Sequence, residues 1–374
     1  MEDRGMVENI SNLDADLNAD LMFSDAYLEQ EESRVYPITA ISAIRKDFLD
    51  NYKRDLKKTT RDEVRYMVQQ LYGLQNQRMQ SKNRVQALVA KDSPRETITW
   101  LADQAQIMED NIKKLMQYVA DSHPIGEWAQ SIPAVGPITT AALMAHIDIT
   151  KAATAGAIWS FAGLNPDQKW LGKSKATELV EKYIPNREKV TTEKIALIAE
   201  EINRPIDSIM KQLIALKPDA PNGNMTKTSL IKVLSRRPWN ADLKVVCWKL
   251  GESFQKNSGR LETKKGPNEY SKVYLKEKAR IIKLNEAGEY EEYALGRSKT
   301  VGTGTEAYKA YSVGKIPPLQ VLNRAKRYAV KLFLAHYHHV AYELEYGTLP
   351  PKPYILDQPG HTHYIAPPNW PMKG

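Results

Sequence analysis

The stretch IPAVGPITTAALMAH, residues 132–146, places a short turn before a run of small and apolar residues. Pro133 and Pro137 stiffen this turn because proline fixes its own φ, and Gly136 lets the backbone pass close to another group. Proline is also favoured in the first turn of a helix. The small residues that follow let a helix pack tightly on its neighbours. The stretch therefore predicts a helix–hairpin–helix.

The start of such a helix is suited to binding an anion. Its first N–H groups have no partner within the helix, and the helix dipole adds positive charge there. We expect this turn to hold a phosphate of DNA through backbone N–H groups and threonine hydroxyls, without reading the bases. The expected contact residues are Val135, Gly136, Pro137, Ile138, Thr139 and Thr140. The alternative is a plain helix bundle, in which the glycine ends one helix and the proline begins the next.

The composition is that of a soluble globular protein with two or three domains. The chain has 374 residues, of which 42% are apolar and 26% are charged. No run of about 18 uncharged apolar residues occurs, so no membrane span is expected. The first residues, MEDRGMVENI, lack the apolar core of a secretory signal, so we expect a cytoplasmic protein. Cys247 is the only cysteine, which excludes an internal disulfide and a cysteine-based zinc site.

Charge is distributed unevenly along the chain. The net charge is +8, and because residues 1–36 carry −8 (ten acids against two bases), the remainder carries +16. A basic body suits the binding of a polyanion, and an acidic leader would compete for the same surface. The alternative is an ordinary basic protein with a disordered leader.

Two long helices with a heptad seam are predicted over residues 60–120. The first begins at Thr60, and the second has Ser93 as its N-cap, Pro94 in its first turn and Glu96 closing a capping box. The seam of the first is Val64, Met67, Leu71, Leu74, Arg78, Ser81, Val85 and Leu88. The seam of the second is Ile98, Leu101, Ala105, Met108, Ile112, Leu115 and Val119. Such spacing predicts a coiled coil, either within one chain or between two chains as a homodimer or higher oligomer.

Residues 183–235 resemble an inserted helix-turn-helix. Thr192 is expected to cap its first helix and Pro205 to start the second, after a turn at residues 202–204. Ala196 and Ile209 are expected to pack across the pair. In this spacing the second helix enters the major groove of DNA. The residues expected to face the groove are Asp207, Ser208, Lys211 and Gln212.

The whole pattern predicts a mainly all-α fold, because no segment is rich in strand signals. Residues 296–305 are expected to form a flexible basic loop and residues 319–346 the last helix. The expected divisions are an acidic leader (1–36), a coiled-coil region (37–122), the helix–hairpin–helix domain (123–182), the insertion (183–235), a helical continuation (236–346) and a Pro-rich tail (347–374).

The segments IPAVGPITTAALMAHIDI and IWSFAGLNP resemble the C-terminal domain of the transposases of bacterial insertion sequences 110, 116 and 902. RRPWNADLKVVCWKLGES is similar to a later helix of the family, with Asn240, Leu243 and Lys244 at matching places. The stretch RAKRYAVKLFLAHYHHVAYELEYGTLPPKPY, followed by GHTHYI, is similar to a subset of these transposases. The resemblance covers roughly residues 60–180 and 236–365. It implies DNA binding in transposition by a protein of a mobile element or phage.

Three features depart from the family pattern. Family members carry a nuclease-like domain whose four acids bind Mg²⁺ on a mixed sheet, whereas residues 1–60 have acids but no strand pattern. A nucleophilic serine precedes a glycine in the family, and here Leu171 precedes Gly172. Ala134 stands where the family has its first turn glycine. Strand cleavage therefore stays open, and the candidate nucleophiles are Ser174, which lies closest to the motif, Ser229 and Ser258.

Histidines gather near the C-terminus. His336, His339 and Glu343 share one helix face, and His361 and His363 lie on one side of an extended segment. Together they predict a Zn²⁺ or Mn²⁺ site. The alternative is that these histidines stack on nearby tyrosines and cap a helix end.

Three functions are compatible with these observations. The first is a DNA-binding, transposase-like protein that recognises a junction or the ends of an element, with RNA as a further partner. The second is an active serine recombinase that cuts DNA. The third is a non-catalytic accessory or structural protein that recruits partners through its coiled coil.

Overall fold

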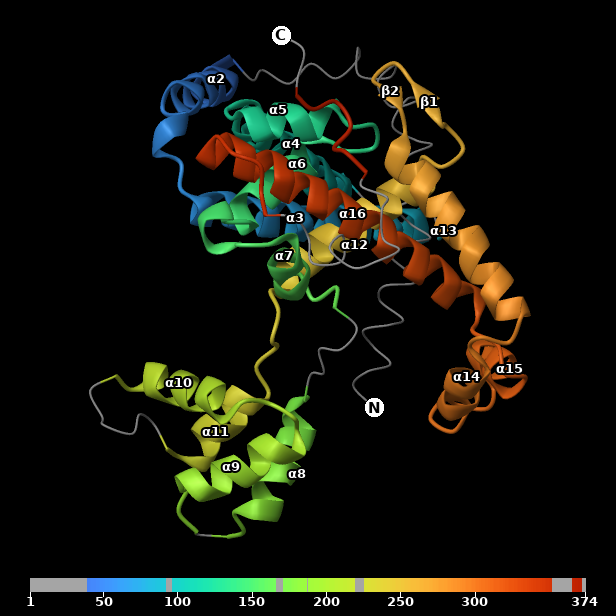
Figure 1. Ribbon diagram of the computed structural model, residues 1–374. Coiled ribbons are helices and arrows are strands. Elements are labelled where there is room, and N and C mark those ends of the chain that lie inside the picture. The colour runs from blue at the N-terminus through green and yellow to red at the C-terminus, as the bar shows by residue number, and fades with distance from the viewer. Residues whose placement is uncertain are drawn as a thin grey trace. The chain divides into compact units, whose positions relative to one another are not determined.

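The structure is a computed structural model that describes residues 39–91, 96–165, 171–186, 188–218, 225–351 and 365–371. Regular structure in these residues is helical except for one short β-hairpin, which confirms the all-α fold class (Figure 1). The chain divides into two compact units, residues 1–127 with 136–146 (unit 1) and residues 128–135 with 147–374 (unit 2). Within the described residues, every helix is too short or too polar to cross a bilayer.

Unit 1 is built on two long helices. Its elements are α2 (Thr39–Arg54), η2 (Leu56–Lys58), α3 (Arg61–Val89), α4 (Glu96–Asp121), the first half of α5 (Pro124–Ser131) and α6 (Pro137–His146). The predicted start at Thr60 is confirmed by a capping box, in which the Glu63 N–H donates to Thr60 Oγ1 at 3.2 Å and the Thr60 N–H donates to Glu63 Oε2 at 2.7 Å. The expected cap at Ser93 and Pro94 lies outside the described residues.

Helices α3 and α4 pack against each other, and the predicted seam holds better for α3 than for α4. Val64, Leu71 and Leu74 are buried as expected. On α4, Ala105, Leu115 and Val119 are buried as predicted. Leu101 and Met108 are exposed, however, at 41% and 55%, and the next residues, Ala102 and Glu109, are buried in their place. The prediction was wrong at these two positions because it selected apolar side chains and so passed over a buried glutamate.

Glu109 is buried at 1% exposure and is fully engaged. Its Oε2 accepts a hydrogen bond from Arg78 Nε at 2.9 Å, and its Oε1 accepts from Lys113 Nζ at 2.6 Å and from Gln75 Nε2 at 3.3 Å. Burial alone would raise the pKa of this carboxyl, but the hydrogen bonds from Lys113 and Arg78 outweigh it and lower the pKa. Arg78 thus occupies an apolar seam position because it neutralises a carboxylate of the facing helix.

Helix α6 packs on α3 and α4 within unit 1. Ala141, Ala142 and Leu143 are fully buried, so the small residues do allow the close packing that the sequence predicted. The other end of α6 is tied to α3, because Arg65 Nε donates to the carbonyl oxygen of Ala145 at 2.9 Å. This contact satisfies one of the carbonyl groups left free at a helix C-terminus.

Unit 2 contains the remaining elements. They are the second half of α5, η3 (Ile149–Lys151), α7 (Ala155–Phe161), α8 (Lys173–Tyr183), α9 (Thr192–Glu201), α10 (Ile206–Leu216), α11 (Lys227–Leu234), α12 (Ala241–Lys256), β1 (Glu262–Thr263), β2 (Gly266–Pro267), α13 (Glu269–Glu286), α14 (Glu291–Ser298), α15 (Glu306–Ser312) and α16 (Pro318–Tyr346). Strands β1 and β2 pair antiparallel. The last helix matches the predicted one, whereas the expected loop at 296–305 was wrong at its start, because residues 296–298 belong to α14.

An aromatic cluster joins α5, α12, α13 and α16 in unit 2. The ring of Trp128 stacks on Phe333 at 5.7 Å between centroids, and Phe333 meets Tyr270 edge-on at 5.2 Å. Phe254 stacks on Tyr270, also at 5.2 Å. All four side chains are buried. Such pairs add about 0.5 to 1.5 kcal/mol each beyond their buried area, so the cluster is a major source of stability for this unit.

Residues 365–371 are held against this core by side chains. Trp128 Nε1 donates to the carbonyl oxygen of Pro368 at 2.9 Å, and Asn369 Nδ2 donates to the carbonyl oxygen of Ser131 at 3.1 Å. Trp370 Nε1 donates to Glu343 Oε2 on α16 at 2.7 Å. The C-terminal segment therefore braces the end of α5 and the end of α16.

Helices α8 to α11 share a hydrophobic core of their own. Two details of the predicted helix-turn-helix are corrected here. Thr191, not Thr192, caps α9, since its Oγ1 accepts from the Lys194 N–H at 3.5 Å. Ala196 is exposed, and its neighbour Ile195 packs inward instead, together with the expected Ile209. Pro205 is the N-cap of α10, which begins one residue later.

The turn that follows α5 has a left-handed residue where the family has glycine. Ala134 adopts a φ of 69°. Its carbonyl oxygen accepts a hydrogen bond from Ser253 Oγ on α12 at 2.6 Å, and the Val135 N–H closes the turn on the carbonyl oxygen of Ile132 at 3.2 Å. Residues with a Cβ are disfavoured in this region by roughly 1–2 kcal/mol. The hydrogen bond from Ser253 helps to hold an alanine in a conformation that glycine adopts freely.

Replacing Glu109 by alanine should destabilise the protein by about 3 to 5 kcal/mol, since Arg78 would be left buried without its counter-ion. Chemical denaturation measures this loss, and Asp110→Ala, at a half-exposed neighbour, is the control, with an expected change below about 1 kcal/mol. Because the folded pKa of Glu109 is lowered, its contribution is present above its unfolded pKa of about 4.3 and declines as the pH falls further. Equal losses for both variants would contradict this account.

Replacing Ala134 by glycine should stabilise the protein by about 0.5 to 1 kcal/mol, because relief of the left-handed strain exceeds the entropy cost of glycine. The measurement is the urea midpoint at unchanged m-value. Ala134→Val should shift the midpoint the opposite way. A lower midpoint for the glycine variant would show that the turn is not strained.

Candidate nucleic-acid interface

The start of α6 presents free backbone N–H groups. The Thr140 N–H donates to the carbonyl oxygen of Gly136 at 3.0 Å and begins the helical pattern. Across the described ranges, no acceptor is found for the N–H groups of Gly136, Ile138 and Thr139, and Pro137 has none to offer. These residues are half-exposed. The geometry is that of an anion-binding helix N-terminus within unit 1.

Gly136 leaves space at this helix start. Its φ is not left-handed, and a Cβ built on it would meet nothing within 4 Å. Among the described residues, none approaches closely enough to require glycine here, and the open space lies beside the free N–H groups. The start of α6 is therefore accessible, whereas Pro133 and Val135 of the preceding turn are buried.

Two of the residues expected to contact phosphate point the other way. The side chain of Val135 is 2% exposed and that of Thr140 is fully buried, so the Thr140 hydroxyl is withdrawn from any ligand outside. The Thr140 Oγ1 has no hydrogen-bond partner. The sequence could not distinguish the two threonines, because the rotation of α6 on α3 and α4 decides which one faces inward. Thr139 remains as the accessible hydroxyl.

The helix pair α9–α10 exposes part of the predicted reading face. Asp207 and Lys211 are exposed on α10, and Ser208 is half-buried. Gln212 Oε1, by contrast, is buried without a partner. The exposed part of this face thus carries one acid and one base.

The histidines of α16 are engaged in hydrogen bonds. His336 Nε2 lies 2.8 Å from the carbonyl oxygen of Ile365, which can only accept, so Nδ1 accepts from the Tyr270 hydroxyl at 2.7 Å. Burial lowers the pKa of His336 to about 4, so the ring is neutral. His338 Nε2 donates to the carbonyl oxygen of Ala152 at 2.9 Å. These contacts tie α16 to distant segments of unit 2.

The predicted metal ligands are only partly brought together. His339 Nε2 lies 3.6 Å from Glu343 Oε2, while His336 uses both of its ring nitrogens elsewhere. The residues that the structure describes contain no group of three or more His, Cys, Asp or Glu positioned to hold a metal. His361 and His363 lie outside those residues, and a Zn²⁺ or Mn²⁺ site that includes them stays a prediction.

The candidate serines lie in three separate settings. Ser174 is exposed in the first turn of α8. Ser229 is buried in α11, and its Oγ accepts from Thr226 Oγ1 at 2.9 Å. Ser258 follows the end of α12. A nucleophilic role for any of them stays a prediction. The lone Cys247 is buried, which raises the pKa of its thiol to about 12 and makes it a poor nucleophile.

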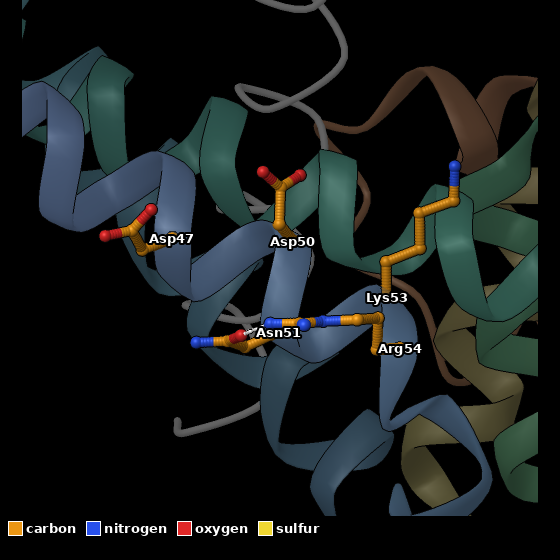
Figure 2. A pocket seen from close by; sticks show the side chains of 5 residues that line it. All are labelled: Asp47, Asp50, Asn51, Lys53 and Arg54. Atoms are coloured by element: carbon orange, nitrogen blue, oxygen red, sulfur yellow. Dashed lines mark hydrogen bonds between the residues drawn. The ribbon is translucent and has the colours of Figure 1, made fainter.

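A hollow over α2 does not have the character of a site. It is lined by Asp47, Asp50, Asn51, Lys53 and Arg54. Figure 2 shows that all five come from one helix, and that only Arg54 and Asn51 meet, through a hydrogen bond. The two carboxylates and the Lys53 ammonium extend separately (Figure 2). Nothing in this arrangement converges on a ligand.

Two segments that carried the sequence resemblance meet in unit 2. Gly163 has a φ of 64°, and a Cβ on it would lie 2.6 Å from Cγ of the Trp239 ring. The Asn240 N–H donates to the carbonyl oxygen of Phe161 at 2.8 Å, and Asn240 Oδ1 caps α12 by accepting from the Leu243 N–H at 2.8 Å. The glycine of the FAGLNP segment is required because the tryptophan of the later segment lies against it.

Comparison with known proteins supports the same resemblance. Residues 127–187 match the model of the Transposase IS116/IS110/IS902 family. No curated protein and no solved structure matches the chain. The matched residues include the turn, α6, α7 and α8. Residues 127–187 are therefore similar to the Transposase IS116/IS110/IS902 family, and this match supports a transposase-like role in DNA transposition.

Proposed function

We propose that this protein binds DNA during transposition and holds a phosphate group at the start of α6. The observation that carries the proposal is the set of free, half-exposed N–H groups at Gly136, Ile138 and Thr139. The open space beside Gly136 leaves room for a backbone to approach closely. The match to a transposase family over residues 127–187 and the net charge of +8 support the same ligand. Contacts of this kind grip the phosphate without selecting a sequence.

The exposed face of α10 supplies a second contact in this proposal. Lys211 projects from the helix that would enter the groove, and Ser208 lies one turn earlier on the same face. Asp207 in the first turn of this helix repels phosphate, so the contact would be made with base edges by Lys211 and Ser208.

Gly136→Asp should weaken DNA binding about tenfold or more, because a carboxylate would stand beside the N–H groups that meet the phosphate. Fluorescence-anisotropy titration of labelled duplex and four-way-junction DNA measures the effect. Gly136→Ala is the matched control, since a methyl group fits without a clash and adds no charge. The affinity of Lys211→Gln, measured in the same way, tests the proposed contact of α10 with DNA.

An unchanged affinity of Gly136→Asp, at unchanged stability, would refute the phosphate contact at α6. Equal losses for the alanine and aspartate variants would assign the effect to backbone geometry rather than charge, and would refute it as well.

We further propose that two copies of the chain associate through α4. Trp100, Leu101, Ile107 and Met108 lie exposed on one side of this helix, at 53%, 41%, 40% and 55%. Their spacing of one and seven residues places them along a single stripe. An exposed apolar stripe on a long helix is typical of a surface covered by another helix, and a second copy of the same hairpin supplies one.

Leu101→Lys combined with Met108→Lys should convert the associated form to monomer, since both changes put charge in the stripe. Light scattering coupled to size exclusion measures the mass. Leu319→Lys, at a 62% exposed leucine of α16, is the control and should leave the mass unchanged. A monomeric wild-type protein at micromolar concentration would contradict the proposal.

A further inference from the structure

Unit 2 carries a group of cations on one face of α16. Arg324, Arg327 and Lys331 recur at gaps of three and four residues, so they share a side of the helix, and the neutral Gln320 lies four residues before Arg324 on the same side. Arg327 is exposed, and Arg324 and Lys331 are half-exposed. This pattern was not recognised from the sequence, because the same residues also read as the polar side of an amphipathic helix.

Aromatic rings lie beside two of the cations in this region, Arg324 on α16 and Lys244 on α12. The Arg324 guanidinium carbon lies 4.7 Å from the centroid of the Tyr290 ring and 5.4 Å from that of Tyr293. Gln320 Nε2 donates to the Tyr293 hydroxyl at 2.8 Å, which steadies the ring. On α12, Lys244 Nζ lies 4.2 Å from the centroid of Trp239. A cation over a ring is oriented but keeps its full charge.

Trp239 is itself rigidly placed. Its ring covers Gly163, where any side chain would collide with it. The next residue, Asn240, caps α12 and is tied to Phe161. Lys244 therefore lies over a tryptophan ring that is held in place by contacts between two segments far apart in the chain.

The cations of α12 and α16 repel one another. Burial lowers the pKa of Lys244, and the neighbouring Arg327 and Arg237 lower it further. Desolvation lowers the pKa of Arg327, and Arg324 adds to that effect. Lys244 on α12 therefore lies close to Arg327 and Arg324 on α16, and we call these three residues the cationic surface.

No carboxylate of the described ranges lies within ion-pair distance of Lys244, Arg324 or Arg327. Other cations of unit 2 are paired: Lys272 with Glu262 at 2.9 Å, Arg280 with Glu277 at 2.7 Å, and Lys326 with Glu252. The mutual repulsion of Lys244, Arg324 and Arg327 costs folding free energy. A surface of this kind is typical of a site for a polyanion, whose charges remove the repulsion on binding.

We propose that the cationic surface of Lys244, Arg324 and Arg327 binds the sugar–phosphate backbone of DNA. A row of cations across two helices fits a chain of phosphates better than a single anion, and arginine can bind phosphate through two parallel N–H groups. This surface lies outside the residues of the family match. The inference extends the proposed DNA binding to unit 2 and does not depend on the start of α6.

The test compares two variants of the full chain with equal loss of charge. The first carries Lys244→Gln, Arg324→Gln and Arg327→Gln. The second carries Lys264→Gln, Lys276→Gln and Lys283→Gln, at three exposed lysines of the same unit. Binding of labelled duplex DNA, single-stranded DNA and RNA of equal length is titrated over a series of salt concentrations. Thermal unfolding verifies that each variant is folded.

The first variant should lose about tenfold or more in affinity for duplex DNA. Its slope of log K against log salt should fall by about 2 to 3, since each phosphate contact contributes about 0.9. The second variant should change much less in both measures. If the first variant unfolds, Arg327→Gln alone, at an exposed side chain, should lower the slope by about 1.

Equal losses for the two variants would overturn the proposal, because binding would then follow total charge alone. A loss restricted to RNA would overturn the assignment to DNA. Gly136→Asp separates this surface from α6: loss of binding in that variant with no loss in the first triple variant would refute the cationic surface and leave the α6 contact standing.

Discussion

The stacking of Trp128, Phe254, Tyr270 and Phe333 is the interaction on which unit 2 depends. Each ring comes from a different helix, so burying them together positions α5, α12, α13 and α16 at once. Ser253 precedes Phe254 on α12 and donates to Ala134, so the core that orders α12 also shapes the turn after α5. The indole N–H of Trp128 also donates a hydrogen bond to the carbonyl oxygen of Pro368. One aromatic cluster thereby fixes the helix whose Ser253 holds Ala134 in the turn after α5.

The buried charges of unit 1 form ion pairs, whereas two cations of unit 2 lie over aromatic rings. In unit 1, Glu109 is closed off by Arg78 and Lys113, and the three charges stabilise a contact between two helices. In unit 2, Lys244 and Arg324 are held over aromatic rings and keep their charge available. The first arrangement serves stability, since removal of one partner leaves a buried charge. The second weakens the fold slightly and leaves positive potential at the surface for a negatively charged partner.

The histidines of α16 illustrate how a suggestive pattern can serve packing. His336 and His338 lie in the interior, where burial lowers the pKa of each and keeps the rings neutral. A neutral ring donates through one nitrogen and accepts through the other, and His336 does both, to Ile365 and from Tyr270. The helix is thus tied to the C-terminal segment and to α13. The spacing of histidines along a helix indicates that they lie on the same side of it. It does not indicate which residues pack against that side.

Local sequence patterns were sufficient to predict where several of the helices lie. The cap at Thr60, the last helix to residue 346 and the small residues of α6 follow from capping chemistry and periodicity, which act over a few neighbouring residues. Contacts between residues far apart in the sequence decide which side chains of these helices are buried and which are exposed. Glu109 is buried in place of Met108 because its counter-ions lie on α3 and on α4 itself. The packing of α6 buries Thr140 and leaves Thr139 accessible. The contact of Gly163 with Trp239 and the proximity of Lys244 to Arg327 involve residues that no short window of sequence contains.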